Sequence, residues 1–477
     1  MKKIVYILFL LTAALAASTT FDKTFGGEWD DYANSAIQTS DGGYLVTGCR
    51  SDSTAYKYSF FVIIKTDSFG EKEWEYEFCG MTSSLTDNAG HSVIETSDGG
   101  YVITGCSEDL IHAIHADLYV IKLNSTGVKM WDYRFGYDSS VSSYGYQIIQ
   151  TEDGGFVISG ENFDSILLVK LDHEGNEEWT NNFYSSGQFR SVIQTEDKGY
   201  FTAGQKYDYF SEQWNVLLCK VDSLGNEETT KFFGSNNYNE AGYYLLRKDN
   251  NLYIAGYTDS LGSGVKDIWI IKTDINGNEI WSRTYGGVEN DIAYTIEKTL
   301  DGCLIIAGTT ESYGAGGIDA WLIKTDLDGN ELWNKTFGGS GNDELRSVQQ
   351  ALDGGYILAG YTDSFGAGGK DMWIIKTDET GTEIESPFLP LMTELYQNYP
   401  NPFNPTTEIS FDLQKEGHVN LTIYNSKGEL VRALFEGLKG KGMHTINFDA
   451  SGLDSGIYFY KLTTENHTIT RKMLFLK

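Results

Sequence analysis

The stretch from Asp319 to Gly369, DAWLIKTDLDGNELWNKTFGGSGNDELRSVQQALDGGYILAGYTDSFGAGG, is one copy of a repeat. Trp281 matches Trp333 and Asp301 matches Asp353, so the repeat has a period of 52 residues. A fixed period of this length is the sequence signature of a repeat architecture. We therefore interpret every local motif as part of a repeating unit.

Each unit predicts four short strands separated by turns. Residues 319–325 form a nearly continuous apolar and β-branched run, as expected for a strand buried on both faces. Gly329 lies in a turn that needs a positive φ. The other strands are expected around Trp333 and Phe337, at 345–351 and, after the hairpin signal Asp353-Gly354-Gly355, at 356–362.

The two turn signals of the unit each occur seven times. The Lys-Thr-Asp-like turn entry lies at Lys65, Lys122, Lys170, Lys220, Lys272, Lys324 and Lys376. The Asp-Gly-Gly-like hairpin lies at Asp41, Asp98, Asp153, Asp197, Asp249, Asp301 and Asp353. Four strands in each of seven repeats predict an all-β fold, a seven-bladed β-propeller with four-stranded blades.

The two ends of the array predict how the ring closes. The array begins with a lone strand of the Trp-containing type at 21–25, whereas its last unit ends after Asp378 without such a strand. We expect residues 21–25 to pair with residues 372–377, because this pairing removes an exposed strand edge.

Composition divides the chain into four segments. Residues 1–18 have two lysines, an apolar run and a small-residue cleavage site, which predict a signal peptide. The propeller is expected over 19–386, with about 52 residues per repeat. All five prolines lie between Pro387 and Pro405, so we place a linker at 387–394 and a second domain at 395–477. No segment is long enough to be an integral membrane span.

The chain is strongly acidic, with a net charge of -31 at pH 7. Such a surface repels phosphate backbones and anionic lipid, which argues against nucleic acid and membrane-surface binding. Solubility of a secreted protein is the simplest explanation, and attraction of cations or basic partners is the alternative.

The five cysteines are odd in number and lie at Cys49, Cys79, Cys106, Cys219 and Cys303. Only Cys49 and Cys106 occupy equivalent repeat positions. An exported protein can oxidise a pair, but the connectivity is not readable from the sequence, and buried free thiols are an equal alternative.

The C-terminal domain has alternating strand patterns that predict a small immunoglobulin-like β-sandwich. It opens with Gln397-Asn-Tyr-Pro-Asn-Pro-Phe-Asn-Pro405, continues with Ile423-Tyr-Asn425 and Ser455-Gly-Ile-Tyr-Phe-Tyr460, and ends with the basic Arg471-Lys-Met473. With these motifs residues 395–477 resemble the C-terminal sorting domain of the type IX secretion system of Bacteroidetes, and the related module of flagellar hook-capping proteins.

That resemblance implies a cargo label rather than an activity. It implies engagement of the type IX secretion machinery and a secreted or extracellular protein, with cleavage of the domain and attachment to the outer-membrane surface as expected later steps. The array itself resembles the secreted propeller repeats that such cargo carries.

Several motifs of the array resemble known sites but are interpreted as structural. Residues 39–43 resemble the Asp box of sialidases, which is itself a turn, and residues 274–281 are similar to the docking motif of quinoprotein propellers, whose Trp is expected to pack between blades. Asp267, Asp319 and Asp371 follow glycine-rich loops, and capping of a turn is favoured there over calcium binding. His112 and His115 need further ligands to bind a metal. No catalytic, cofactor-binding or metal-binding residue and no cofactor is therefore nominated.

If the array has a ligand surface, we expect it on the irregular loops of the early repeats, because variable loops on a rigid scaffold often carry function. They lie at 52–59, 81–89, 107–117, 137–144 and 207–214. Ordinary drift in loop length and sequence is the alternative. We predict a secreted or cell-surface binding or structural propeller that is not an enzyme, with a glycan or protein ligand on these loops. The alternative is a secreted polysaccharide hydrolase or lyase built on the same scaffold.

Overall fold

The structure is a computed structural model of the full chain. It describes residues 20–51, 59–78, 88–108, 115–136, 142–162, 165–235, 238–382, 394–395, 398, 400–413, 417–440, 442–464 and 468–477. The chain divides into two compact units, Met1–Ile384 and Glu385–Lys477. The expected signal peptide, and the expected linker except for Glu394, lie outside the described residues.

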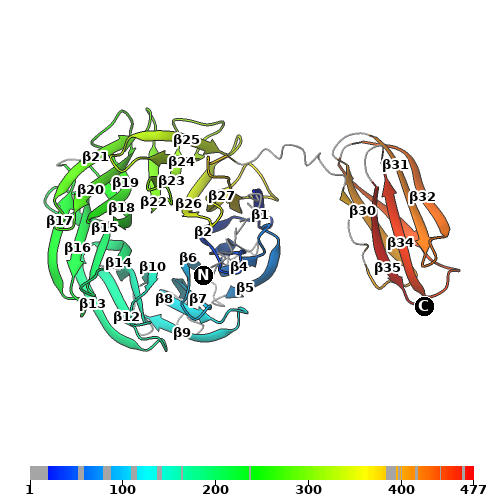
Figure 1. The fold of residues 1–477 in the computed structure, drawn as a ribbon, viewed down its shortest axis with the longest axis horizontal. Coiled ribbons are helices and arrows are strands. Elements are labelled where there is room, and N and C mark those ends of the chain that lie inside the picture. The colour runs from blue at the N-terminus through cyan, green and yellow to red at the C-terminus, as the bar shows by residue number, and fades with distance from the viewer. Residues whose placement is uncertain are drawn as a thin grey trace, which may run out of the picture. The chain divides into compact units, whose positions relative to one another are not determined.

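Seven four-stranded antiparallel sheets stand around a central axis in the first unit (Figure 1). The innermost strands are β2 (Asp31–Gln38), β6 (Ala89–Glu95), β10 (Ser143–Gln150), β14 (Gly187–Gln194), β18 (Glu240–Lys248), β22 (Asp291–Lys298) and β26 (Asp343–Gln350). The second strands are β3 (Tyr44–Ser51), β7 (Tyr101–Glu108), β11 (Phe156–Asn162), β15 (Tyr200–Asp208), β19 (Asn251–Thr258), β23 (Leu304–Thr310) and β27 (Tyr356–Thr362).

The third strand of each blade is an almost fully buried apolar run, and the fourth is the half-exposed outer strand. The third strands are β4 (Ser59–Thr66), β8 (Ala116–Leu123), β12 (Ser165–Leu171), β16 (Gln213–Val221), β20 (Asp267–Asp274), β24 (Asp319–Thr325) and β28 (Asp371–Lys376). The outer strands are β5 (Lys72–Phe78), β9 (Lys129–Phe135), β13 (Glu177–Ser185), β17 (Glu227–Phe233), β21 (Glu279–Tyr285), β25 (Glu331–Phe337) and β1 (Phe21–Phe25). The seven-bladed propeller predicted from the repeat is confirmed.

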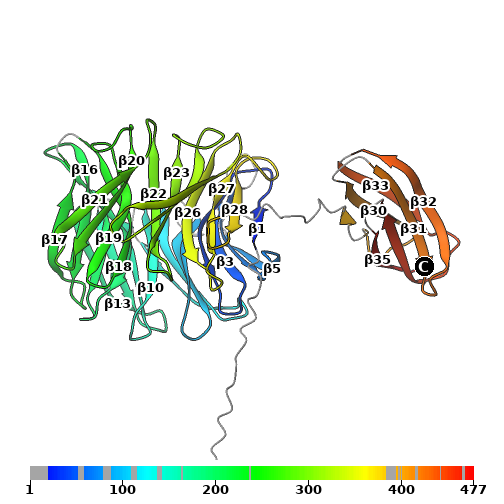
Figure 2. The same ribbon diagram turned by 45° about the horizontal axis from the view of Figure 1, so that its top comes forward.

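The N-terminal strand closes the ring as predicted. β1 pairs antiparallel with β28, in a register that places Phe21 opposite Lys376 and Phe25 opposite Met372. Figure 2 shows β1 beside β28 and β27, although the first and last strands of the propeller are the most distant in sequence. The last blade is thereby completed, and no edge of β28 is left unpaired.

In six blades an ion pair between a mostly buried lysine and a more exposed aspartate joins the two turn signals. The lysine of the third strand points to the hairpin between the first two strands, where it meets the aspartate carboxylate. The Nζ–Oδ distances are 3.0 Å for Lys65–Asp41, 2.7 Å for Lys122–Asp98, 3.2 Å for Lys170–Asp153, 2.8 Å for Lys220–Asp197, 2.6 Å for Lys324–Asp301 and 2.9 Å for Lys376–Asp353. The hairpin is thus held in place by a charge that the third strand supplies.

The fifth blade lacks this ion pair because its hairpin is shorter. Only two residues separate the end of β18 at Lys248 from the start of β19 at Asn251, and Asp249 adopts a left-handed conformation with φ of 55°. The ammonium group of Lys272 instead donates to the backbone carbonyl of Leu327, at 2.9 Å, in the following blade.

Aromatic side chains of the outer strands pack between blades, as expected for the Trp of this motif. Each ring covers a glycine of the next blade's turn, and a Cβ added at that glycine would come within 3.1 Å of the ring. The ring–glycine pairs are Phe21–Gly70, Trp74–Gly127, Trp131–Gly175, Trp179–Gly225, Trp281–Gly329 and Trp333–Gly381. All six glycines have positive φ, so the position excludes a side chain for two independent reasons.

The second unit is a small sandwich of two sheets around one apolar core, which confirms the predicted β-sandwich. The first sheet has the order β29 (Glu394–Leu395), β30 (Thr406–Leu413), β33 (Gly442–Asp449). The second has the order β32 (Leu430–Lys439), β31 (Gly417–Asn425), β34 (Gly456–Thr463), β35 (Thr468–Phe475). Phe411, Ile423 and Met473 are among the fully buried core residues that both sheets contribute.

The opening motif of this unit is anchored to its core. Asn398 is buried; its backbone N–H donates to the hydroxyl of Tyr460 at 2.9 Å, and its side-chain amide donates to the hydroxyl of Thr407 at 2.9 Å. The asparagine of this opening motif therefore has a structural role.

We expect Asp353→Asn to lower the free energy of unfolding of the propeller by about 3 kcal/mol, because it leaves the buried ammonium of Lys376 without its countercharge. Asp249→Asn is the control, since Asp249 makes no ion pair with a buried lysine. All ten tryptophans lie in the propeller, so denaturant unfolding followed by tryptophan fluorescence reports on this unit alone. Equal effects of both substitutions would contradict the role of the ion pair.

We expect Gly329→Ala to destabilise the propeller more than Gly302→Ala, by about 1–3 kcal/mol. Both glycines have positive φ, 75° and 83°, so the conformational cost is matched. A Cβ at Gly329 would lie 2.9 Å from the ring of Trp281, whereas nothing lies within 4 Å of one at Gly302. Thermal unfolding of the two variants isolates the contribution of interblade packing, and similar melting temperatures would exclude it.

Candidate ligand site in the central channel

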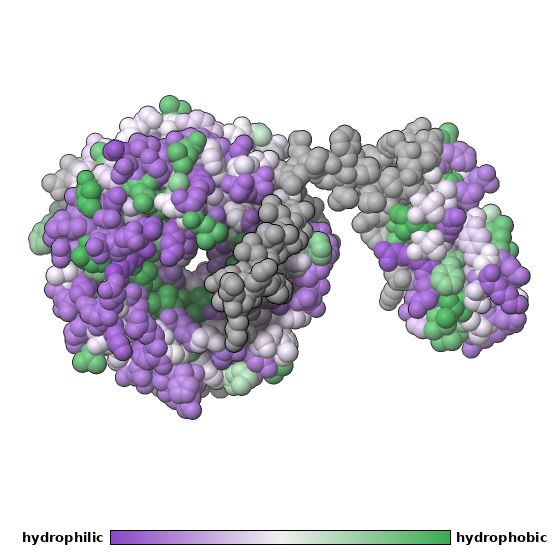
Figure 3. Space-filling view, viewed as in Figure 1, coloured by the Kyte–Doolittle hydropathy of each residue, from purple (hydrophilic) through white to green (hydrophobic). Residues whose placement is uncertain are grey.

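The seven innermost strands line a central channel. The channel contains a cavity of about 820 Å³, within the volume range of small-molecule sites. The space-filling view shows its opening at the middle of the ring (Figure 3). Most of the lining residues come from β2, β6, β10, β14, β18, β22 and β26, so every blade contributes, and Cys49, Ser59, Asn88 and Lys370 complete the lining.

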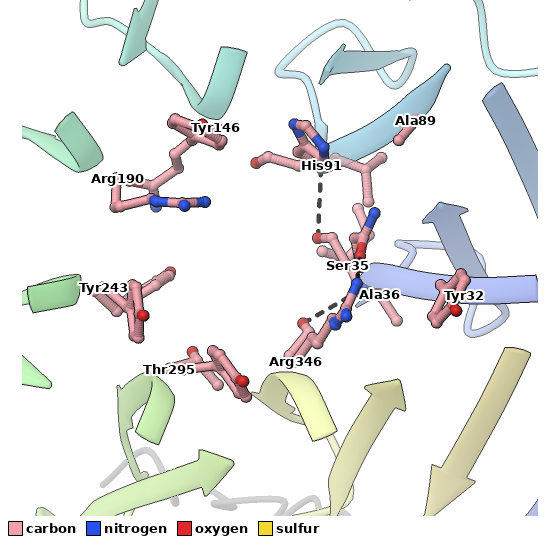
Figure 4. A pocket seen from close by; sticks show the side chains of 18 of the residues that line it. Tyr32, Ser35, Ala36, Ala89, His91, Tyr146, Arg190, Tyr243, Thr295 and Arg346 are labelled. Carbon is pink, nitrogen blue, oxygen red and sulfur yellow. Dashed lines mark hydrogen bonds between the residues drawn. The ribbon is translucent and has the colours of Figure 1, made fainter. Parts of the chain in front are cut away.

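Each innermost strand has a β-bulge at the same place, and the extra residue lines the cavity. The residues at the register shifts are Asn34, His91, Tyr146, Arg190, Tyr243, Tyr294 and Arg346. A β-bulge adds one residue that has no partner on the neighbouring strand, and this extra residue changes the direction in which a side chain points. Figure 4 shows several of these side chains directed at a common open centre.

The residue after the bulge ties neighbouring blades together. The hydroxyl of Ser191 accepts a hydrogen bond from the backbone N–H of Leu245 at 3.0 Å, and the side-chain carbonyl of Gln147 accepts one from Val192 at 2.6 Å. The contact of a backbone N–H with a serine hydroxyl recurs at three other places. There Val93 donates to Ser35, Ile148 to Ser92 and Ala36 to Ser347. The channel wall is therefore a connected frame that positions the bulge residues.

Three of the bulge residues form a hydrogen-bonded arc. Arg346 donates to the side-chain carbonyl of Asn34 at 2.6 Å and to the carboxylate of Glu344 at 2.5 Å. The amide of Asn34 donates to the carbonyl of Gly90 at 2.8 Å, and Nδ1 of His91 makes the equivalent contact with Gly145 at 2.8 Å.

His91 is a neutral acceptor in the channel. A carbonyl oxygen can only accept, so Nδ1 of His91 carries the proton and Nε2 keeps a lone pair. Burial, together with the guanidinium groups of Arg190 and Arg346, lowers the pKa of His91 to about 4 against the opposing effect of the hydrogen bond to Gly145. The ring stacks on Tyr146 with a centroid separation of 5.6 Å.

Arg190 lies between two tyrosine rings. Its guanidinium carbon is 3.9 Å from the ring centroid of Tyr146 and 5.7 Å from that of Tyr243. Its Nε is buried and has no hydrogen-bond partner among the described residues. The charge of Arg190 is therefore balanced by aromatic faces and not by a carboxylate.

The channel tyrosines and Glu297 differ from His91 in the direction of their pKa shifts. Burial raises the pKa of Tyr146, Tyr243 and Tyr294 above the usual range, so these phenols stay protonated. The lining carboxylates are Glu297 and Glu344. Burial raises the pKa of Glu297, which accepts a bond from Tyr244 at 3.3 Å, and Glu344 is paired with Arg346.

The aspartates considered for calcium lie outside this cavity and accept backbone N–H groups. Asp267 accepts from Gly264 at 3.0 Å, Asp319 from Ala315 and Gly316 at 3.1 Å, and Asp371 from Ala367 at 2.8 Å. Each caps its glycine-rich loop, the interpretation that the sequence favoured. Within the described ranges no group of three or more His, Cys, Asp or Glu is arranged to hold a metal.

The other candidates that the sequence suggested are only partly covered by the described residues. His112 and Cys79 lie outside them, as do most of the irregular loops. The hairpin at 207–214 is described, and there Tyr207 packs against Trp214 with a centroid distance of 5.4 Å while Phe210 is fully exposed. Cys106 belongs to a small buried cluster against which Cys49 packs. Burial raises the pKa of the Cys219 thiol to about 12.

Sequence reasoning missed the seven channel residues, although a signal for them exists. In six repeats the bulge residue precedes the hairpin aspartate by seven positions, as Asn34 precedes Asp41 and Arg346 precedes Asp353. When the repeats are aligned on that aspartate, the residue type at this position varies among the repeats, whereas the residues on either side of it are similar. Among the later repeats, which look almost interchangeable, the seventh has Arg346 where the fifth and sixth have Tyr243 and Tyr294.

The part of the chain that the structure describes contains no helix with the length and apolar character of a membrane span. Residues 397–475 match the family described as secretion system C-terminal sorting domain. The regulatory protein FlaEY of Caulobacter vibrioides is 25% identical over 172 residues, an alignment that covers 31% of this chain and 18% of that protein. The chain thus spans less than a fifth of this curated relative.

Among solved structures, a protein of unknown function from Bacteroides caccae has 12% identity and a TM-score of 0.38, over 61% of this chain and 94% of that one. PorZ, an essential surface component of the type IX secretion system of Porphyromonas gingivalis, has 10% identity and a TM-score of 0.33, over 95% and 75%. The AfRom2 CNH domain has 6% identity and a TM-score of 0.42, over 75% and 99%. These scores are too low to bear on what this chain does.

We expect the stability of the wild-type protein, relative to His91→Asn, to fall by about 3 kcal/mol as the pH is lowered from 7 to below 4. The folded-state pKa of about 4 lies below the ordinary value near 6.5, so the stability that neutral His91 contributes is present above pH 6.5 and lost as the pH falls through 4. Asparagine is a matched replacement, because Asn34 makes the equivalent bond in the first blade. Parallel pH profiles of unfolding for both proteins would contradict a buried neutral histidine.

Proposed function

We propose that this protein, which its sorting domain directs through the type IX secretion system to the cell surface or the medium, is a non-catalytic propeller that binds a ligand in its central channel. One observation carries the proposal. Seven backbone positions with the same bulge geometry present Asn, His, Tyr and Arg side chains to one cavity. Positions with a scaffold role, such as the buried lysine of the third strand, keep one residue type in all seven blades.

A channel site fits the physical chemistry of recognition. The cavity is concave, aromatic side chains supply contact area, and a few fixed polar groups supply orientation, which is the usual composition of small-molecule sites. The interblade hydrogen bonds of Ser191 and Gln147 hold the wall rigid, so little conformational entropy is lost on binding. The irregular loops remain an alternative location for a ligand.

The alternative function, a polysaccharide hydrolase or lyase, requires groups that exchange protons near the working pH. His91 has a pKa of about 4, the channel tyrosines have raised pKa values, and Glu344 is paired with Arg346. Burial raises the pKa of Glu297 towards the working range, but a hydrolase that uses two carboxylates needs a second one, and Glu344 is held by its ion pair. This pattern favours binding over catalysis. The proposal also includes cleavage of the sorting domain and attachment to the outer-membrane surface. Both steps are inferred from the resemblance of the C-terminal domain to sorting domains.

The proposal is tested with the full chain against a panel of glycans and peptides. The double variant Asn34→Tyr/His91→Tyr narrows the channel. It places tyrosine at two bulge positions, as three other blades already have at the equivalent position. We expect the double variant to lose at least tenfold in affinity for any ligand of the wild type, and Phe210→Ala in the exposed hairpin to retain it.

Two results would contradict the proposal. Loss of binding in Phe210→Ala with retention in the double variant would move the site to the loops. Product release that Glu297→Gln or Glu344→Gln abolishes would identify an enzyme. Thermal unfolding of each variant shows whether a loss of affinity reflects a loss of fold.

A further inference from the structure

Resting on the proposed channel site, we infer that its ligand is a sugar acid, a ring-shaped hydroxylated molecule whose carboxylate binds Arg190. Two arginines line the cavity, Arg190 and Arg346, and of these Arg346 is the one with a carboxylate partner within the described ranges. Arg50 is paired with Glu75 and Glu77, Arg247 with Glu196 at 2.7 Å, and Arg346 with Glu344. No carboxylate of the described residues lies within ion-pair distance of Arg190, although it is one of the bulge residues that face the cavity.

Arg190 is half-buried and has aromatic rings but no carboxylate beside it, so a ligand carboxylate would supply the countercharge that the described residues do not. Tyr146 covers one face of the Arg190 guanidinium at 3.9 Å, and Tyr243 lies 5.7 Å away. Stacking occupies the face of the planar group and leaves the N–H donors at its edge. This edge is the part of arginine that binds a carboxylate with two parallel hydrogen bonds. Figure 4 shows Arg190 reaching from the wall toward the open centre.

A second cation that has no carboxylate partner among the described residues lines the same cavity. The ammonium of Lys370 lies 4.2 Å from the ring centroid of Tyr361 and 5.3 Å from that of Tyr32. The cavity is thus locally cationic in a chain whose net charge is -31. The acidic exterior repels polyanions, whereas a ligand with a single carboxylate and an otherwise neutral body is repelled much less.

The rest of the wall suits the neutral body of such a ligand. The rings of Tyr243 and Tyr294 lie 5.5 Å apart and line the cavity beside Arg190. Nε2 of His91 is an acceptor for a hydroxyl group, because Nδ1 is used by Gly145. Aromatic faces and neutral polar groups beside the guanidinium of Arg190 match a sugar ring with one carboxylate and several hydroxyls.

The test measures calorimetric binding of paired methyl glycosides to the full chain. Methyl glucuronide and methyl galacturonide carry a carboxylate where methyl glucoside and methyl galactoside carry a CH₂OH group. We expect the wild type to bind an acidic member at least tenfold tighter than its neutral partner. Arg190→Gln is expected to weaken binding of the acidic member by about 10- to 100-fold and to leave the neutral one unchanged.

Arg247→Gln is the matched control, because Arg247 is paired with Glu196 away from the cavity. It should leave all affinities unchanged. Equal affinity for acidic and neutral members, or no effect of Arg190→Gln, would overturn the inference. Tighter binding of sulfate, or of a peptide through its C-terminal carboxylate, would overturn it in favour of a generic anion or a peptide ligand.

The same binding measurements distinguish a failure of this inference from a failure of the proposed function. If neutral glycosides bind to the wild type and are lost in the narrowed double variant, the channel is the site but its ligand is not an acid. If uronides bind equally well to the wild type and to the double variant, neither the channel site nor the inference survives.

Discussion

The pairing of β1 with β28 is the constraint on which the rest of this structure depends. A four-stranded blade has two apolar faces, and it can bury them only against neighbours on both sides. An open array would leave the faces of its first and last blades exposed, together with an unpaired strand edge. When residues 21–25 complete the last blade, every blade has two neighbours, and the central channel becomes an enclosed site.

Two further devices fix how the blades sit within that closed ring. The ion pair within a blade, such as Lys376 with Asp353, fixes the inner hairpin against the third strand. The aromatic ring over a glycine, such as Trp281 over Gly329, fixes the outer strand against the next blade. The fifth blade shows that one loss is tolerated, because Lys272 finds a backbone carbonyl of the neighbouring blade instead of a carboxylate. Redundancy among equivalent contacts allows individual repeats to drift.

The same repetition creates the opportunity for function. A β-bulge at one place in each inner strand gives seven side chains a common direction, and the scaffold does not constrain their type. Arg190 and His91 differ from Tyr146 and Tyr294 at equivalent positions, so the channel is chemically asymmetric inside a symmetric frame. The low pKa of His91 and the raised pKa of Tyr294 both arise from this enclosure, since burial disfavours the charged form of each group.

The sequence by itself determined the number of blades, the closure of the ring by residues 21–25 and the nature of the C-terminal domain. These features rest on signals that are local or strictly periodic, such as the Asp-Gly-Gly hairpins, the apolar third strands and the motif around Asn398. It also identified Asp371 and its equivalents as loop-capping residues. It pointed to the irregular loops as the functional surface and did not identify the channel.

Only the tertiary structure decided that Asn34, Arg190 and Arg346 share one cavity. The inward direction of these side chains depends on a one-residue register shift between strands, which alternation along a single strand does not reveal. Their proximity depends on ring closure, which brings together residues that are more than 300 positions apart, as the bond from Arg346 to Asn34 shows. Periodic and local patterns specify elements, whereas a site assembled from one residue per blade exists only once all seven blades meet around the axis.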